Sequence, residues 1–448
     1  MSFPLSDSTQ LRCGTIATFT VRLTSVALTT IAALAWTPAL AQETFKLGIV
    51  TFLSGPAAES FGVPAANGGK VLIEALNAGT VPAPYNKKGF GGMQIVPVIV
   101  DENGGATKQV QEMRNLFDRE KVDAVIGYVG SGDCLAVAPV AEEMKRFLVL
   151  YDCGTPRIFE EKKYNYVFRT ASHAAMDNIG LVRYMKKKGI TPKDVVGINQ
   201  DYAWGQDSWR DFKASLEAMA PTANVKGELW PKFGAGQYGS EISTMLGQNP
   251  GLLYSSLWGG DLQSFILQGA PRGMFKGRTV AFAAADHVLQ PLGDKFPDGV
   301  IVGARGAYGQ MSRKSPLNDW LWAEYAKAYP NSYPVQPQYR MVQGLLGVKA
   351  AVEKAMSSNG GKKPNTDELV KAMTGLSWDS PGGKVTMTLG AGHQATHEIA
   401  FGISKYDPAK KMVMLTDIER FSAECVNPPE GLLAEAWIKS GLRGAKCD

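Results

Sequence analysis

The chain has 448 residues, of which 45% are hydrophobic and 20% are charged. This composition excludes collagen-like, disordered and coiled-coil proteins, and the length is sufficient for two or three domains. The formal net charge is only +5, from 47 Lys and Arg residues against 42 Asp and Glu residues. Without a long basic run, so small an excess gives no electrostatic footprint, and we expect no nucleic-acid partner.

The first segment has the pattern of a secretory signal peptide. Arg12 and Arg22 precede an apolar stretch at residues 24–36, and residues 38–41 end in an Ala-x-Ala cleavage motif. We therefore expect residues 1–41 to be a signal peptide and the rest to reach the periplasm as a free soluble protein. A membrane anchor is the alternative, but the apolar stretch is shorter than the ~20 residues that span a bilayer.

Apolar runs of strand length alternate with helical patterns along the mature chain. Strands are expected at residues 45–50, 94–100, 122–128, 147–152, 195–198, 252–254, 280–282 and 300–302. Helices are expected at residues 62–78, 106–119, 317–328 and 339–356 and around Trp209 and Leu216. A surface insertion is expected at residues 79–92, and β-like pieces at residues 377–405. Pro97 indicates a strand start or a sheet edge.

The expected strands are apolar without alternation, which indicates that both faces of each sheet are covered. Strands that alternate with helices form parallel sheets, so the class is α/β. The two runs of strands together are too long for a single core. We therefore expect two doubly wound α/β lobes.

The cysteine count agrees with export to an oxidising compartment. Four cysteines follow residue 41, an even number that suits disulfides. Of the three pairings that they allow, we expect Cys134–Cys153 and Cys425–Cys447, because the members of each pair lie close in the sequence. A metal site is the alternative, but the cysteines lack the Cys-x-x-Cys spacing of a zinc site. We therefore expect neither a metal nor a cofactor.

The sequence lacks the common catalytic motifs. It has no Gly-x-Ser-x-Gly elbow, no phosphate-binding Walker loop and no His-Glu-x-x-His motif. His393 and His397 are four residues apart in a Gly-rich β-like stretch, where helical facing does not apply, so we favour a surface pair over a metal site. We expect that the protein is not an enzyme. The alternative is a secreted amidase-like enzyme that uses Asp133 or Cys134.

Polar and aromatic residues follow six of the expected strands, at residues 54–62, 130–134, 153–156, 201–205, 257–261 and 285–287. Ligands of open parallel sheets bind at these carboxyl ends. The first lobe offers hydroxyls and glycine amides near helix starts, which suit a carboxylate. The second offers Tyr202, Trp204 and Trp258, flat rings with a polar edge.

Each of these residues also has a structural reading. Ser131 and Thr155 could be helix caps, and Trp204 and Trp258 could be core aromatics. Taken together, the six loops favour a pocket for an amino acid or a small aromatic acid. A Cys134–Cys153 bridge would tie the two hydroxyl-bearing loops together.

At these residues the chain resembles the periplasmic substrate-binding proteins of ABC importers for branched-chain amino acids, the leucine/isoleucine/valine-binding type. The segments that carry the resemblance are residues 47–50, 54–56, 125–127, 130–132, 168–170, 201–205 and 258–261. The resemblance implies a type I periplasmic binding protein-like fold, with two lobes that are joined by three crossovers and close like a hinge. Residues 42–171 and 306–395 would form lobe 1, and residues 172–305 and 396–448 would form lobe 2.

The resemblance also implies which residues contact the ligand. Those that match the family's contacts to the carboxylate and ammonium are Ser131, Gly154 and Thr155. Those that match its aromatic contacts are Phe61, Trp204 and Trp258. Asp286 is the candidate acidic partner of the ammonium, with Asp133 in reserve. Gly132 and Tyr202 complete the candidate set.

We therefore expect a monomeric periplasmic receptor that captures a small carboxylate-bearing ligand, a branched-chain or other amino acid. It would hand this ligand to an ABC permease in the inner membrane. The candidate pocket is more aromatic than a leucine site needs. Because similar proteins bind aromatic acids, amides or urea, these ligands are the alternatives.

Overall fold

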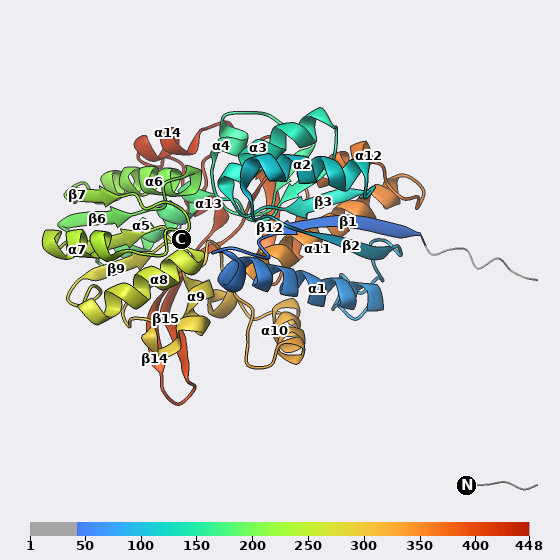
Figure 1. The fold of residues 1–448 in the computed structure, drawn as a ribbon. Helices are drawn as coiled ribbons and strands as arrows, with labels where there is room; N and C mark the ends of the chain where they lie inside the picture. Colours follow the sequence, from blue (N-terminus) through green and yellow to red (C-terminus); the bar gives the residue numbers. More distant parts are fainter. Residues whose placement is uncertain (1–42, 448) are drawn as a thin grey trace, which may run out of the picture. The chain divides into compact units, whose positions relative to one another are not determined.

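The computed structural model of the chain describes residues 43–447, so the signal-peptide prediction for residues 1–41 lies outside the described residues. The described part contains two β-sheets (Figure 1). The strands of the first sheet are β1 (Thr44–Thr51), β2 (Gln94–Asp101), β3 (Ala124–Gly127), β4 (Leu148–Leu150), β5 (Val167–Arg169), β11 (Ser377–Ser380), β12 (Gly383–Leu389) and β13 (Gln394–Thr396). Those of the second sheet are β6 (Asp194–Ile198), β7 (Asn224–Leu229), β8 (Leu252–Ser255), β9 (Thr279–Phe282), β10 (Ile301–Gly303), β14 (Ile399–Asp407) and β15 (Met412–Phe421).

Helices connect the strands of both sheets. Those that accompany the first sheet are η1 (Ala58–Gly62), α1 (Val63–Ala78), α2 (Gly105–Asp118), α3 (Ser131–Glu143), α4 (Arg157–Glu160), α10 (Pro316–Ala328), α11 (Gln336–Ser358) and α12 (Thr366–Met373). Those that accompany the second are α5 (Ala174–Lys187), α6 (Ala203–Met219), α7 (Gly239–Gln248), α8 (Gly259–Gly269), α9 (Asp286–Leu292), α13 (Ala423–Val426) and α14 (Ala434–Lys439). Short 3-10 turns are η2 (Ala270–Arg272), η3 (Gly293–Lys295) and η4 (Gly309–Met311).

Both sheets have the same parallel core. The first runs in the order β11-β12-β13-β5-β4-β3-β1-β2 and the second in the order β15-β14-β10-β9-β8-β6-β7. In the first sheet β1 to β5 pair in parallel, β13 joins β5 in parallel, and β12 and β11 extend that edge with antiparallel pairs. In the second sheet β6 to β10 pair in parallel, and β14 and β15 extend the edge with antiparallel pairs. The chain passes between the sheets after β5, after β10 and after β13. Two α/β lobes with three crossovers are therefore confirmed, while the residue boundaries of the lobes stay predictions.

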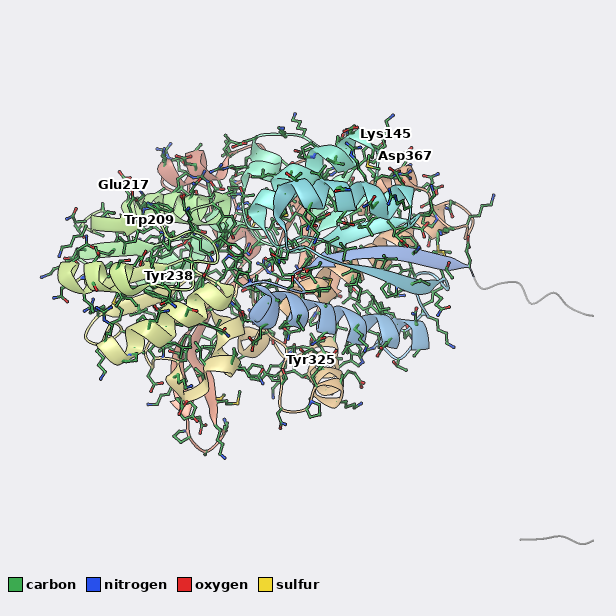
Figure 2. The ribbon with its side chains drawn as sticks, viewed as in Figure 1. Lys145, Trp209, Glu217, Tyr238, Tyr325 and Asp367 are labelled. Carbon is green, nitrogen blue, oxygen red and sulfur yellow. A yellow bond between two sulfur atoms is a disulfide. The ribbon has the colours of Figure 1, made fainter. Side chains whose placement is uncertain are left out.

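The non-alternating strands are buried on both faces. All residues of β3 and β4 are buried. In the first lobe, α2 and α3 cover one face and α1 and α11 the other (Figure 1). In the second lobe, α6 packs Trp209 and Phe212 against Tyr254 of β8, and α5 lies beside α6. The buried side chains labelled in Figure 2 are Trp209 on α6, Tyr238 just before α7 and Tyr325 on α10.

The strands at the sheet edges differ most from the sequence expectation. The patterns did not indicate β7, which is mainly exposed, or β15, most of whose residues are half-buried or exposed. Pro97 lies in β2, the last strand of the first sheet, so the expected edge is confirmed. Within residues 43–447, none of the helices combines the length and the apolar character needed to pass through a lipid bilayer.

Both expected cysteine pairs are confirmed. Cys134 of α3 bonds to Cys153, which follows β4, and Cys425 of α13 bonds to Cys447. The Cα atoms are 6.5 Å apart in the first pair and 4.7 Å apart in the second, within the usual range. The first disulfide joins the segments that follow the neighbouring strands β3 and β4.

We expect the double variant Cys134→Ala/Cys153→Ala to lose about 2–4 kcal/mol of unfolding free energy, because the bridge restricts the unfolded chain. The two residues are 19 positions apart, and the other pair is 22 apart. The chain-entropy effect is therefore nearly equal for both, and Cys425→Ala/Cys447→Ala is the matched control. Urea unfolding measures both, and a first variant as stable as the wild type would contradict the expectation.

Candidate functional site

A cavity lies where the carboxyl ends of strands from both sheets meet, and we call it the cleft. Its lining comes from η1, from the segments that follow β3, β4, β6, β8, β9 and β10, and from the first residue of α11. The lining residues are Phe61, Val129, Ser131, Asp152, Gly154, Tyr202, Trp204, Trp258, Ala284, Arg305 and Gln336. This is where ligands of open parallel sheets bind.

Four aromatic side chains form one part of the lining. The indole Nε1 of Trp258 donates to the hydroxyl of Tyr202 at 2.8 Å, and Phe61 meets Trp258 edge to face with centroids 5.2 Å apart. The Nε1 of Trp204 donates to the carbonyl of Ser256 at 3.0 Å. Because both indole N–H groups have partners in the protein, these rings offer the cleft mainly apolar surface.

Ser131 lies at the start of α3 and accepts hydrogen bonds from the loop that follows β4. Its Oγ accepts hydrogen bonds from the backbone N–H groups of Gly154 and Thr155, both at 3.2 Å. These distances are at the long end of the normal range, so a charged oxygen would bind the same donors more strongly. This corner of the cleft therefore suits a ligand carboxylate.

A second pair of amides in the first lobe is already occupied. The carboxylate of Glu102 accepts from the N–H groups of Val129, at 2.8 and 2.9 Å, and Gly130, at 2.7 Å. Burial and the nearby Asp133 raise the pKa of Glu102 well above its ordinary value. The expectation of free amides is wrong for Gly130, and Val129 is occupied in the same way, because the protein's own carboxylate accepts from both.

Beneath the cleft lies a buried ionic network. Oδ1 of Asp152 accepts from Arg305 at 2.7 Å and also from Arg340, while Nε of Arg305 donates to Asp177 at 2.9 Å. Arg340 also donates to Ser172 Oγ at 2.8 Å. Asp152 and Arg340 belong to elements of the first sheet, whereas Arg305 and Asp177 belong to elements of the second. The network therefore joins the two lobes and balances two guanidinium groups with two carboxylates.

Two side chains of the lining have unused polar atoms. Oδ2 of Asp152 and both amide atoms of Gln336 have no hydrogen-bond partner among the described residues, although both side chains are fully buried. Buried polar atoms usually have partners, and each exception needs an explanation. Both residues line the cleft, so these atoms are candidates for contacts with a ligand.

Six of the ten sequence candidates line the cleft: Phe61, Ser131, Gly154, Tyr202, Trp204 and Trp258. The other four, Gly132, Asp133, Thr155 and Asp286, are not part of the lining. Their roles as ligand contacts stay predictions.

Two of these four have partners that account for their positions. The hydroxyl of Thr155 donates to Asp207 of α6 at 2.6 Å, which links the two lobes. Asp133 lies beside Glu102, and its pKa is raised to about 6, mainly by burial.

Sequence analysis missed five lining residues: Val129, Asp152, Ala284, Arg305 and Gln336. Asp152 and Arg305 follow strands, so the rule used for the other candidates could have found them. Gln336 begins a helix after a loop that follows no strand, and no sequence signal placed it at the cleft.

Asp286 and His287 lie at the start of α9. Oδ2 of Asp286 accepts from the N–H of Gln336 at 2.8 Å, and burial raises the pKa of Asp286 to about 7. His287 Nε2 accepts from the N–H of Gly259 at 2.9 Å, which requires a neutral ring, and burial lowers its pKa to about 3. Asp286 thus fixes the backbone that carries Gln336.

The lobes meet tightly at the cleft. Its volume is about 10 Å³, enough for no more than about one water molecule. The guanidinium of Arg305 stacks on the ring of Trp204 at 4.2 Å, and both press on Gly154, where a Cβ atom would overlap them. Side-chain rearrangement or lobe separation is therefore required before a solute enters.

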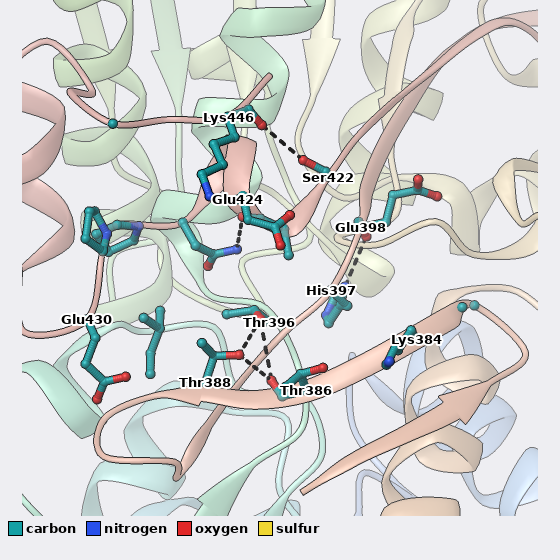
Figure 3. A pocket seen from close by; sticks show the side chains of 18 of the residues that line it. Lys384, Thr386, Thr388, Thr396, His397, Glu398, Ser422, Glu424, Glu430 and Lys446 are labelled. Carbon is teal, nitrogen blue, oxygen red and sulfur yellow. Dashed lines mark hydrogen bonds between the residues drawn. The ribbon is translucent and has the colours of Figure 1, made fainter. Parts of the chain in front are cut away.

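A larger hollow of about 770 Å³ lies elsewhere, between β12 and β13 on one side and the segment after β15 on the other (Figure 3). It shares no lining residue with the cleft. Many of its polar groups bond one another, such as Thr388 with Thr396 at 2.9 Å and Ser422 Oγ with the carbonyl of Lys446 at 3.2 Å. It therefore offers a ligand fewer free groups than its size suggests.

The expected surface histidine pair is wrong, because His393 and His397 are both buried. His393 stacks on Phe168 with ring centroids 4.2 Å apart, and His397 packs near Tyr308. The two histidines flank β13, which pairs with β5 inside the first sheet. The Gly-rich composition of this stretch did not indicate that it is buried. No group of three or more potential metal ligands occurs in residues 43–447.

Two α/β lobes that are joined by three crossovers, with a cleft at the carboxyl ends of their strands, are the architecture of a solute-binding protein. The chain belongs to the periplasmic binding protein family, whose model matches residues 44–405.

Individual relatives are distant but cover most of the chain. Leu/Ile/Val-binding protein homolog 6 of Brucella abortus (strain 2308) is 24% identical over 372 residues, 82% of this chain and 88% of its own length. A solute binding protein from Rhodopseudomonas palustris BisB5, solved with 3,4-dihydroxybenzoic acid, has a TM-score of 0.72 at 22% identity and covers 86% of this chain and 99% of that one. An ABC-type branched-chain amino acid transporter from R. palustris CGA009 has a TM-score of 0.64 at 24% identity and covers 86% and 98%.

We expect Asp286→Asn to change the dependence of stability on pH. The folded-state pKa of Asp286 is raised from 3.8 to about 7, so the folded chain holds a proton that the unfolded chain releases. The wild type should therefore lose stability from this group as the pH rises from about 4 to about 7. Asparagine does not titrate and can still accept the bond from Gln336.

Urea unfolding between about pH 4 and about pH 8 tests this expectation. The advantage of Asp286→Asn over the wild type should grow as the pH rises. The exposed residue Asp294 supplies the control Asp294→Asn, which should follow the wild-type curve. A constant difference between Asp286→Asn and the wild type across this range would refute the expectation.

Proposed function

We propose that this chain is a periplasmic receptor that captures a small carboxylate-bearing solute and delivers it to an ABC permease in the inner membrane. Membership of the periplasmic binding protein family supports the receptor role. We further propose that residues 1–41 are a signal peptide cleaved after Ala41, and that the mature protein is a monomer that binds its ligand without turnover.

The observation that carries this proposal is the composition of the cleft. Four rings supply apolar surface, while Ser131 and the amides beside it supply donors for an anionic oxygen. The unpartnered atoms of Asp152 and Gln336 supply bonding capacity at other points of the lining. A ligand that combines a carboxylate, a flat body and a hydrogen-bond donor would satisfy all three features.

The rings favour an aromatic body over a branched aliphatic one. Structural neighbours from R. palustris were solved with 3,4-dihydroxybenzoic acid and with 4-hydroxybenzoate, and their phenolic hydroxyls are donors of the kind that Asp152 would accept. An ammonium group would serve Asp152 equally well. We therefore rank hydroxybenzoates and aromatic amino acids first, and branched-chain amino acids second.

Binding would shift the equilibrium between an open and a closed arrangement of the two lobes. A ligand that touches both walls stabilises the closed arrangement by the free energy of contacts that only this arrangement makes. Ser131 and Asp152 belong to the first lobe, whereas Trp204 and Trp258 belong to the second. A solute held between them would shift the population toward the closed form, the form that we propose docks on the permease.

Isothermal titration of the mature protein with 4-hydroxybenzoate, phenylalanine and leucine tests the proposal. We expect the aromatic acids to bind most tightly. The neutral matched compound 4-hydroxybenzamide should bind at least about tenfold more weakly, because charge-assisted hydrogen bonds to the carboxylate are lost. Mass spectrometry should recover each ligand unchanged. Failure of every carboxylate to bind, or conversion of a bound compound, would count against the proposal.

We expect Trp258→Ala to weaken binding of 4-hydroxybenzoate by roughly 1–3 kcal/mol, because a ring that stacks on the ligand is lost. Trp320 of α10 is half-buried outside the cleft, so Trp320→Ala is the matched control and should bind as the wild type does. Titration calorimetry measures both variants, with circular dichroism to confirm folding. Equal affinities for the two variants would assign Trp258 to packing alone.

A further inference from the structure

A second pocket, which we call the side pocket, lies beside the paired strands β5 and β13 of the first sheet. Its volume is about 490 Å³, and it shares no lining residue with the cleft. One wall comes from residues 156–165, around α4, and the facing wall from residues 389–394 and 428–433. Arg169, the last residue of β5, is also part of the lining.

Arg169 is a buried cation that forms no ion pair with a carboxylate of residues 43–447. Its side chain is 0% exposed, and its Nε donates to the amide oxygen of Gln394 at 2.5 Å. Its Nη1 donates to the carbonyls of Cys153, at 3.1 Å, and Thr155. Its Nη2 has no hydrogen-bond partner among residues 43–447. An unpaired buried charge is unfavourable, so an anion that reached Nη2 would be stabilised.

The charges around Arg169 leave a cationic excess. Burial lowers the pKa of Arg169 only to about 9, so the guanidinium keeps its charge at neutral pH. Lys162 and Lys163 are exposed at the rim and form no ion pair within the described chain. Two carboxylates oppose these three cations, but each already accepts a backbone N–H: Glu160 from Ala434 at 2.9 Å and Glu430 from Ala391 at 3.0 Å.

The two histidines of the lining add no charge. Burial lowers the pKa of His173 well below its ordinary value, and it also lowers the pKa of His393. Nδ1 of His173 has no partner in the described part of the chain, so a second unused polar atom lies at the same pocket. A neutral imidazole can donate one hydrogen bond to an anion bound at Arg169.

The walls of the side pocket also contain apolar side chains. The ring of Phe159 lies 5.7 Å from the guanidinium carbon of Arg169, and Leu389 lies on the facing wall. Leu432 and Leu433 are each 51% exposed, among the most exposed large apolar side chains of the described residues. Burial of such surface by a ligand is favourable.

From the unpaired guanidinium and the apolar side chains beside it, we propose that the side pocket is a second binding site, for a small carboxylate with an apolar body. The carboxylate bonds Nη2 of Arg169, and the apolar body lies between Phe159 and the two leucines. This site is separate from the cleft and does not depend on what the cleft binds.

Crystals soaked with 4-bromobenzoate test the proposal directly, because anomalous scattering locates the bromine. We expect a peak between Phe159 and Leu432, whether or not a second peak lies in the cleft. A peak in the cleft alone would overturn the side-pocket proposal and leave the receptor proposal standing. The neutral isostere 4-bromobenzamide should give no side-pocket peak, and an equal peak would overturn the role of the charge.

A rim substitution tests the same point in solution without removing Arg169, which also supports the loop at Cys153 and Thr155. Leu432→Glu places a negative charge at the mouth of the pocket, and Leu432→Gln is the uncharged control of the same size. With 4-fluorobenzoate followed by ¹⁹F NMR, we expect Leu432→Glu to weaken side-pocket binding at least about fivefold relative to Leu432→Gln, through charge repulsion. Signals from the cleft should not change. Equal affinity of the two variants would contradict an anion site.

Discussion

The buried carboxylate of Asp152, shared by two guanidinium groups, is the interaction on which the binding region depends. Arg340 approaches it from a helix of the first lobe, and Arg305 approaches it from a strand end of the second. Removal of one partner from such a network costs about 3–5 kcal/mol, because the remaining charge stays buried without compensation. The network therefore requires Asp152 and Arg340 from the first lobe together with Arg305 from the second. It also fixes the guanidinium on which Trp204 stacks, so the same contacts that join the lobes position one wall of the cleft.

This balance of charge also affects what the cleft can bind. Because the two carboxylates Asp152 and Asp177 neutralise the two arginines, the network presents a ligand with little net charge. A carboxylate must then be held by directed hydrogen bonds, and the donors at Ser131 are of this kind. The carboxylate of Glu102 already accepts from the amides of Val129 and Gly130, so these two donors do not serve a ligand. Geometry more than overall electrostatic attraction would thus select the ligand.

The fold class could be predicted from the sequence because most strands of the parallel cores are uninterrupted apolar runs. Runs buried on both faces, such as β3 and β4, read as uninterrupted apolar segments, and their alternation with helices leaves few topologies. The edge strand β7 carries no such signal, since one side of it faces solvent. For the site, the rule of strand ends found the aromatic residues of the cleft. It could not reveal that Glu102 turns inward to fill two amides, or that Gln336 arrives from a distant helix, because both depend on tertiary packing.

The loop at residues 153–155 has an unusual number of attachments, and these attachments determine which parts can move. The disulfide of Cys153 binds it to α3, Arg169 holds two of its carbonyls, and Ser131 holds two of its amides. All of these ties lie within the first lobe, so the loop is a rigid part of that lobe. Across the lobes, Asp207 accepts from the hydroxyl of Thr155 and from Arg157, at 2.6 and 2.9 Å. Opening the cleft must break these contacts with Asp207 but none of the internal ties. We therefore expect the opening proposed above to displace the lobes as two rigid bodies, with the donors at Ser131 held in place.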